Sequence, residues 1–382
     1  MIITDFCTGC RACEQLCPTH CIYVEPDEEG FIVAKIDENA CVECGVCVKR
    51  CPQNNPPEKN VPIRVVGIRY KDNDVLKESA SGGVFIALAS RVLDEGGIAV
   101  GAAYLDDWKV GHIIVNDKAF LYKLQSSKYV QSDTFRTFSE VKEYLVKGRK
   151  VLYSGTPCQI EGLYSYLRKD YDNLFTIDLI CHGVPSPKLF QKYIKWLETK
   201  NRGVILYYNF RDKSSGWGLG YKTKTKTKII TKSAALDPYY YHFLKGDIYR
   251  ECCYRCNYCT RDRVGDITIG DYWGIEKEHP EFYSTKGVSL ALINTPKGMN
   301  ALSDAEELFY IQESTFERAV KANHNLSRPT ERSSMRDTIY LRMNELTVEE
   351  LFEKELKYPF NLMTALKGIL PVWLKLLLKK MK

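Results

Sequence analysis

The strongest constraint on this chain is a pair of identical cysteine runs within its first 51 residues. The first run is Cys7-x-x-Cys10-x-x-Cys13-x-x-x-Cys17 followed by Pro18, and the second is Cys41-x-x-Cys44-x-x-Cys47-x-x-x-Cys51 followed by Pro52. Each cysteine of the second run lies 34 residues after its counterpart in the first. Three thiols at two-residue intervals let one short loop wrap three corners of a cubic core, and Gly9 and Gly45 supply the backbone freedom for that wrapping.

This spacing predicts two [4Fe-4S] clusters of the bacterial ferredoxin type, in which the fourth cysteine of each run binds the other cluster. We assign one cluster to Cys7, Cys10, Cys13 and Cys51, and the other to Cys41, Cys44, Cys47 and Cys17. The alternatives are a disulfide framework and a structural zinc site, but zinc usually takes paired C-x-x-C units rather than triplets followed by Cys-Pro. Cys21 is a spare cysteine and is interpreted as a packing residue. The sequence therefore predicts electron transfer.

The bulk properties of the chain are those of a globular protein from a reducing compartment. Its 382 residues are enough for two or three domains. The first residues show neither the basic region nor the apolar run of a signal peptide, and thiolate-bound clusters need a reducing environment, so we expect a cytoplasmic protein. The formal charge of +6 counts the cysteines as neutral. Three clusters of about −2 each would cancel it, so bulk charge does not favour nucleic-acid binding.

The hydrophobic pattern divides the chain into three domains. Residues 1–58 form a ferredoxin-like unit with short strands at 22–24 and 31–33, and a proline-rich linker spans residues 52–62. Residues 63–300 alternate strands with helices, which predicts an α/β (α+β) catalytic domain. The strands are expected at 64–70, 98–104, 151–153 and 174–180, and the helices at 84–95, 141–147, 160–168 and 188–200.

Residues 301–382 are expected to form a helical C-terminal region with a basic amphipathic end. Pro371 and the lysines within 360–382 exclude a membrane-spanning helix. This end suits either packing against the protein or a partner, or peripheral contact with the inner face of a membrane. Residues 221–228 alternate lysine with other residues, which predicts an edge strand protected by its lysines or a docking face for an acidic partner or a polyanionic cofactor tail.

Six further cysteines lie outside the two N-terminal runs. They are Cys158, Cys181, Cys252, Cys253, Cys256 and Cys259. Cys158 and Cys181 each follow a predicted strand, so these thiols can converge at one end of a sheet, where sites in open α/β folds form. Soft thiolates select an iron–sulfur cluster or zinc, so a third cluster is expected, with structural zinc and ordinary buried thiols as alternatives.

Five short segments in a fixed order carry a family resemblance. They are Ser79-Ala-Ser-Gly-Gly83, Ser127-Lys-Tyr-Val-Gln-Ser132, Gly155-Thr-Pro-Cys-Gln159, Cys181-His-Gly183 and Asp266-Ile-Thr-Ile-Gly-Asp-Tyr-Trp-Gly274. With the ferredoxin-like unit, they make residues 1 to about 320 resemble the coenzyme F-420 (deazaflavin) hydrogenase/dehydrogenase beta-subunit family. The resemblance implies an iron–sulfur flavoprotein that binds FAD and passes electrons between clusters and a second organic partner. Some relatives reduce chlorophyll intermediates, and others accompany enzymes of surface-polysaccharide or sugar modification.

The resemblance also implies site residues. By position, Cys158, Cys181, Cys253 and Cys256 resemble the ligands of a catalytic-domain cluster. Cys252 and Cys259 are additional, and either could replace Cys253 or Cys256. His182 is a candidate proton donor to reduced flavin or substrate, with ordering of its own loop as the alternative.

A flavin site is expected around the segment 79–83, which precedes a helix whose free N–H groups favour an anion. The flavin-binding candidates are Ser79, Ser81, Gly82, Gly83, Lys128, Tyr129, Gly155 and Thr156. The serines can donate hydrogen bonds, and Lys128 and Tyr129 can supply a cation and a stacking face. A plain helix cap is the alternative for the first segment. Asp271 and Trp273 are expected to shape the pocket.

The sequence thus predicts an FAD- and [4Fe-4S]-dependent oxidoreductase that relays electrons from the ferredoxin domain through an inner cluster and the flavin to a substrate. Its partners would be a redox protein or a small organic electron acceptor or donor. The alternatives are an electron-transfer subunit that feeds a partner enzyme and has no substrate site, or a redox sensor. No G-x-G-x-x-G follows a strand, so a nicotinamide site is not expected. The substrate, the direction of electron flow and the use of deazaflavin are left open.

Overall fold

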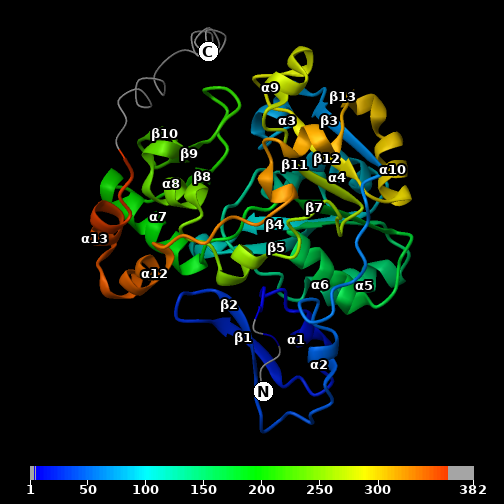
Figure 1. Ribbon diagram of the computed structural model, residues 1–382, viewed down its shortest axis with the longest axis horizontal. Helices are drawn as coiled ribbons and strands as arrows, with labels where there is room; N and C mark the ends of the chain where they lie inside the picture. The colour runs from blue at the N-terminus through cyan, green and yellow to red at the C-terminus, as the bar shows by residue number, and fades with distance from the viewer. Residues whose placement is uncertain (1–3, 5, 360–382) are drawn as a thin grey trace.

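The computed structural model describes residues 4 and 6–359 (Figure 1). The predicted basic amphipathic end, residues 360–382, lies outside the described residues. Within them, eight strands form one mixed sheet in the order β13-β3-β12-β11-β7-β6-β4-β5. The strands are β3 (Arg64–Tyr70), β4 (Ile98–Tyr104), β5 (Val110–Val115), β6 (Val151–Gly155), β7 (Leu174–Leu179), β11 (Ile267–Asp271), β12 (Ser289–Ile293) and β13 (Phe309–Glu313). The predicted α/β class is therefore confirmed, and the region after residue 300 contributes a strand as well as helices.

The centre of the sheet is parallel and its edges are antiparallel. Strands β4, β6, β7 and β11 run in the same direction, whereas β5 lies antiparallel to β4, and β12 lies antiparallel to β11. Each parallel crossover contains a helix, as parallel pairing requires. The carboxyl ends of the four parallel strands consequently meet at one edge of the sheet, and the loops that follow them lie close together.

Helices cover both faces of the sheet. The helices of the body are α3 (Asn73–Glu78), α4 (Val84–Asp94), α5 (Thr137–Val146), α6 (Pro157–Leu167), α7 (Pro187–Asn201), α8 (Pro238–Lys245), α9 (Ile275–Glu278), α10 (Pro296–Ser303), α11 (Phe316–Val320), α12 (Arg336–Glu345) and α13 (Val348–Glu350). Leu152 of β6 packs in the apolar cluster of α4 and α10, whereas its neighbours Val151 and Tyr153 pack in the cluster of α5 and α6. This alternation follows from the two-residue period of a strand and buries both faces. Among the described residues, no helix is both long and apolar enough to cross a bilayer.

A smaller antiparallel sheet lies beside the large one. It consists of β8 (Tyr207–Asn209), β9 (Gly220–Lys224) and β10 (Ile229–Ser233) in the order β10-β9-β8. Its side chains join those of α7, α8 and α12 in an aromatic cluster that includes Tyr193, Tyr208 and Tyr239. The predicted lysine strand ends at Lys224, sooner than expected, because residues 225–228 form a turn. Within β9, Thr223 is buried and Lys222 is half-buried, so the predicted alternation holds over this shorter span.

The N-terminal unit packs against the carboxyl edge of the large sheet. It contains α1 (Ala12–Leu16), the hairpin of β1 (Ile22–Pro26) and β2 (Ile32–Ile36), and α2 (Val46–Lys49). The buried Gln131 side chain accepts a hydrogen bond from the Ile32 N–H at 2.9 Å and donates one to the Thr8 carbonyl at 3.3 Å. Arg11 forms a bidentate ion pair with Asp133, with N–O distances of 2.5 and 2.7 Å. These contacts fix the first cysteine run relative to the sheet.

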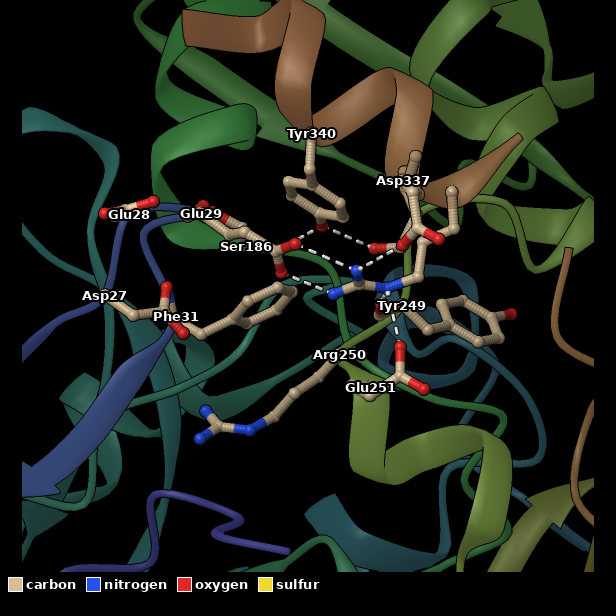
Figure 2. A network of polar contacts seen from close by, with 12 residues as sticks. Asp27, Glu28, Glu29, Phe31, Ser186, Tyr249, Arg250, Glu251, Asp337 and Tyr340 are labelled. Carbon is tan, nitrogen blue, oxygen red and sulfur yellow. Dashed lines mark hydrogen bonds and ion pairs between the residues drawn. The ribbon is translucent and has the colours of Figure 1, made fainter. Parts of the chain in front are cut away.

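The tip of the β1–β2 hairpin is held by a second set of contacts, shown in Figure 2 around Glu29, Ser186 and Tyr340. Arg336 donates from Nη1 to Glu29 Oε1 at 2.9 Å and from Nε to the Tyr249 carbonyl at 2.8 Å. Ser186 donates to the Glu29 carbonyl. The N-terminal unit is thus attached to the body through its first cysteine run and through the tip of its hairpin.

The Arg11–Asp133 pair provides a test of this docking. We expect Asp133→Asn to lower the free energy of unfolding by about 1.5–3 kcal/mol, because a partly buried charged hydrogen bond is lost. The matched control is Asp94→Asn, which removes the exposed pair between Lys118 and Asp94 and should change stability by less than about 0.5 kcal/mol. Urea unfolding of the two variants measures the difference. Equal effects of the two substitutions would contradict the proposed role of the pair in docking.

Candidate functional site

The N-terminal cysteines line two cavities. The proximal cavity, of about 350 Å³, is lined by Cys7, Cys10, Cys13 and Cys51. The distal cavity is lined by Cys17, Cys41, Cys44 and Cys47, together with Cys21. In each cavity the structure brings together three cysteines of one run and the fourth of the other. This is the grouping that the sequence predicts for two clusters.

The two runs also share their backbone conformation. Gly9 and Glu43 occupy equivalent positions, with φ values of 73° and 51°. Arg11 and Gly45 form the next equivalent pair, with φ values of 62° and 69°. Left-handed residues of this kind occur in the backbone concavities that bind anions. At Gly9 a glycine is required, because an added Cβ would lie 2.5 Å from the Ile32 carbonyl oxygen.

A third cavity, here called the cysteine cavity, lies at the carboxyl edge of the parallel strands. It is lined by all six remaining cysteines, namely Cys158, Cys181, Cys252, Cys253, Cys256 and Cys259. Cys158 lies in the first turn of α6, after β6, and Cys181 follows β7. The other four come from the 3-10 segment η4 (Glu251–Arg255) and the turn after it. The structure thus assembles the predicted quartet together with Cys252 and Cys259.

Two of the buried thiols, one beside the proximal cavity and one in the cysteine cavity, are poor anions in the protein alone. Burial raises the pKa of Cys10 and of Cys181 to about 12 in each case. A thiolate at these positions therefore needs a cationic partner, which a metal centre supplies. Among residues 4 and 6–359, no three His, Cys, Asp or Glu side chains converge closely enough to share a single metal ion. The cysteines are instead spread around the cavities.

A fourth cavity adjoins the cysteine cavity and contains most of the predicted flavin residues; it is here called the larger cavity because its volume exceeds the volume of about 60 Å³ of the cysteine cavity. The volume of the larger cavity is about 250 Å³, and the predicted residues that line it are Ser79, Ser81, Gly83, Lys128, Tyr129, Gly155, Thr156 and His182. Asp271 and Trp273 line it too. Gly82 lies behind the lining, where its N–H donates to Ser289 Oγ at 2.8 Å and an added Cβ would lie 2.2 Å from the Ile68 carbonyl oxygen. Gly82 therefore permits close packing of this loop against β3 and β12.

Several polar side chains that line the larger cavity already form hydrogen bonds within the protein. Ser79 and Ser81 donate to the carbonyls of Val75 and Val288. Lys128 Nζ donates to three carbonyls of its own loop, those of Lys123, Gln125 and Ser126. Lys128 thus orders the loop, whereas the first turn of α4, which begins at Val84 after Gly83, opens on the cavity with no side-chain cap.

His182 stands where the cysteine cavity and the larger cavity meet, because it lines both. Its ring lies 5.9 Å from that of His324, centroid to centroid. Burial lowers the pKa of His182 to about 4, so the side chain is neutral near pH 7. Any proton donated by His182 would therefore come from a neutral imidazole.

Sequence reasoning missed two polar groups beside this cavity. His112 of β5 is 2% exposed, and its Nε2 donates to the Ser154 carbonyl at 3.0 Å. Because Nε2 carries the hydrogen, Nδ1 is an acceptor, and it has no partner among the described residues.

The second group is Arg211, which forms a buried bidentate pair with Asp271, with N–O distances of 2.5 and 2.8 Å, and donates to the Tyr129 hydroxyl. Burial alone would raise the pKa of Asp271, yet Arg211 holds it below its ordinary value. A single histidine in a strand, or a single arginine just beyond one, carries no spacing signal, so the sequence could not mark either.

The four cavities follow one another in space. The distal and proximal cavities share the lining residue Ile36, and the proximal and cysteine cavities share Thr8 and Gln53. The cysteine cavity and the larger cavity have seven lining residues in common, which are Ser132, Thr156, Gln159, Cys181, His182, Gly183 and Val184. Helix α6 spans part of this path, because Cys158 lines the cysteine cavity and an added Cβ at Gly162 would lie 2.8 Å from Cys10 Cβ.

Comparison with known proteins confirms the resemblance predicted from the sequence. Residues 148–319 match the family described as the C terminus of the coenzyme F420 hydrogenase/dehydrogenase beta subunit. Residues 6–55 match a 4Fe-4S dicluster domain, which supports N-terminal iron–sulfur clusters.

Curated relatives match part of the chain. The F subunit of the F(420)H(2) dehydrogenase of Methanosarcina mazei is 24% identical over 50% of this chain and 59% of its own length. The uncharacterized protein MJ1349 of Methanocaldococcus jannaschii is 26% identical over 45% of this chain and 55% of its own length. The chain thus spans little more than half the length of these relatives. A solved structure of the F420-reducing [NiFe] hydrogenase complex from Methanosarcina barkeri covers 77% of this chain and is itself covered to 91%, with 19% identity and a TM-score of 0.46.

The close approach of α6 to the first cysteine run provides a test that does not depend on function. We expect Gly162→Ala to lower the free energy of unfolding by about 1–3 kcal/mol, because the added methyl group overpacks the contact with Cys10. Iron should also be lost more readily to a chelator. Gly101→Ala is the control, because its added Cβ would meet no atom closer than 3.6 Å. A Gly162→Ala protein as stable as the control would show that the contact is not tight.

Proposed function

From the match of residues 148–319 to the coenzyme F420 hydrogenase/dehydrogenase beta subunits, and of residues 6–55 to a 4Fe-4S dicluster domain, we propose that this protein is an iron–sulfur flavoprotein oxidoreductase. It relays electrons between [4Fe-4S] clusters, FAD and an organic substrate or a deazaflavin-type coenzyme. The observation that carries the proposal is the unbroken series of four cavities, three lined by cysteines and the fourth by the predicted flavin residues.

The cysteine cavity fits a third [4Fe-4S] cluster. Its thiols come from three loops at one sheet edge, and burial keeps the pKa of Cys181 high, so Cys181 binds as a thiolate only beside a cationic core. By position in the family, Cys158, Cys181, Cys253 and Cys256 are the ligands, with Cys252 and Cys259 as the neighbouring alternatives. The proximal cavity adjoins this one through Thr8 and Gln53, which sets the order of the clusters.

The larger cavity fits the flavin. The open first turn of α4 beside Gly83 suits a phosphate, and His112 Nδ1 offers a buried acceptor that the protein leaves unused. FAD exchanges two electrons with an organic molecule and single electrons with clusters. His182 and Cys181 lie on the wall shared with the cysteine cavity, so this chain places the flavin residues next to the innermost thiols.

The distal cavity is suited to a redox protein partner. Cys44 is exposed, and Val42 beside it is 64% exposed, so a cluster there would lie at the surface. The other four cysteines of that cavity are buried or half-buried. We therefore propose that electrons enter or leave through the N-terminal unit and that the organic partner reacts at the opposite end of the series.

The iron content tests the third cluster. We expect about twelve irons per chain in anaerobically reconstituted protein, corresponding to three [4Fe-4S] clusters. Cys253→Ser and Cys256→Ser should each retain about eight, because one ligand of the third cluster is lost, whereas Cys252→Ser and Cys259→Ser should retain about twelve. Colorimetric iron analysis with EPR of the reduced protein measures this. A wild-type protein with eight irons and no flavin would refute the catalytic-domain assignment, and a loss of four irons from Cys252→Ser or Cys259→Ser would change the ligand set.

Flavin affinity tests the larger cavity. We expect His112→Phe to raise the Kd for FAD about five- to tenfold, because one buried hydrogen bond to the ligand is lost. His112→Gln keeps an acceptor and should lose less. Burial lowers the pKa of His112 to about 4, so the ring stays neutral and the difference between wild type and His112→Phe should be constant from pH 8 to about 5.5. Quenching of FAD fluorescence measures the Kd, and equal affinities of His112→Phe and wild type would exclude the contact.

A further inference from the structure

Arg250 joins the two innermost cysteine sites. It immediately precedes η4, which carries Cys252 and Cys253, and its side chain lines the cysteine cavity. Its Nε donates to the Cys7 carbonyl at 2.8 Å, and its Nη1 donates to the Ile32 carbonyl at 2.8 Å. Figure 2 shows the side chain extending from the body past Phe31 of the N-terminal unit. The guanidinium therefore reaches from the loop of one cysteine site to the loop of the other.

The guanidinium of Arg250 has no carboxylate partner, and the acidic group that it contacts is the thiol of Cys252, to which it is hydrogen-bonded. The residue is 5% exposed, and within residues 4 and 6–359 its guanidinium has no carboxylate within ion-pair distance. The other buried arginines differ, since Arg211 pairs with Asp271, Arg263 lies 3.6 Å from Asp178 and Arg336 pairs with Glu29. A buried guanidinium without a carboxylate partner is costly, so an anionic group is expected beside it. A [4Fe-4S]²⁺ core with four thiolates carries about −2 and would supply that charge from either side.

We propose that Arg250 is a positioning residue that serves as the shared counter-charge of the proximal cluster and the cluster of the cysteine cavity. This inference rests on the proposed function, because it requires both clusters. Each one-electron reduction adds a negative charge next to the guanidinium, so Arg250 makes reduction of both clusters more favourable. Its two backbone hydrogen bonds also fix the Cys7 loop relative to η4, and with it the gap that an electron crosses.

A comparison with Arg336 distinguishes this electrostatic role of Arg250 from a purely structural one. Arg336 lies at the same interface and holds the hairpin through Glu29 and the Tyr249 carbonyl, yet it lines neither of the two cysteine cavities. Arg336→Gln removes the same charge from the same interface as Arg250→Gln. Comparing these two variants therefore separates an effect on docking of the N-terminal unit from an electrostatic effect on the clusters.

The test is an EPR-monitored redox titration of full-length protein, reconstituted anaerobically and checked for about twelve irons. In Arg250→Gln, we expect one-electron reduction of the two inner clusters to become about tenfold less favourable. This change corresponds to about 59 mV per cluster. The distal cluster should be unchanged, and Arg336→Gln should leave the potentials of all three clusters unchanged. Arg250→Lys keeps the charge without the forked geometry and should shift the inner potentials by less than about threefold.

The results that would refute the proposed role of Arg250 are as follows. If Arg250→Gln carries twelve irons with unchanged potentials, or if Arg336→Gln shows the same shift, the inference is refuted and Arg250 is a docking residue only. If Arg250→Gln does not retain its iron, Arg250→Lys decides, and a tenfold shift in that variant overturns the electrostatic role. A wild-type protein with eight irons refutes the proposed function itself, which distinguishes that failure from failure of the inference.

Discussion

The parallel pairing of β4, β6, β7 and β11 is the constraint on which the rest of the structure depends. It directs the carboxyl ends of the four strands to one edge, so residues distant in the sequence, such as Thr156, Cys181 and Asp271, surround adjoining cavities. Neither the cysteine cavity nor the larger cavity could form from one segment alone. The N-terminal unit is then attached at this same edge, which extends the series of cavities by two.

The attachment of that unit relies on polar contacts as much as on apolar packing. Phe31 joins the aromatic cluster of the body, but Gln131 and Arg250 donate to backbone carbonyls across the junction, and Arg336 pairs with the Glu29 carboxylate. Hydrogen bonds to carbonyls fix distance and orientation more narrowly than apolar contact does. This suits a relay, because the separation between neighbouring redox sites must be constant even though a small unit with two cysteine cavities has little apolar core of its own.

Local patterns were sufficient to predict much of this architecture. The cysteine spacing defined the two N-terminal groups, and the hydrophobic pattern placed β3 at 64–70 and β4 at 98–104, the bounds that the structure shows. The ordered motifs marked most of the lining of the larger cavity. Residues whose role arises from tertiary contact were not predictable. Arg211, Arg250 and His112 stand in segments without any repeated spacing, and only the folded chain shows which of their polar atoms are paired.

The buried charged groups of the site differ in whether the protein supplies them with a partner of opposite charge. In the protein alone, Arg211 and Asp271 form an ion pair beside the predicted flavin residues, whereas Arg250 has no carboxylate to pair with. Burial raises the pKa of Cys10 and Cys181, which disfavours the thiolates, while Arg250 is a cation without a carboxylate. An iron–sulfur cluster would stabilise both the thiolates and the Arg250 guanidinium, because its iron is cationic and the cluster with its thiolates is anionic as a whole. A cluster bound beside Arg250 would therefore offset the charge of its guanidinium, and this argues that cluster binding and docking of the N-terminal unit stabilise each other.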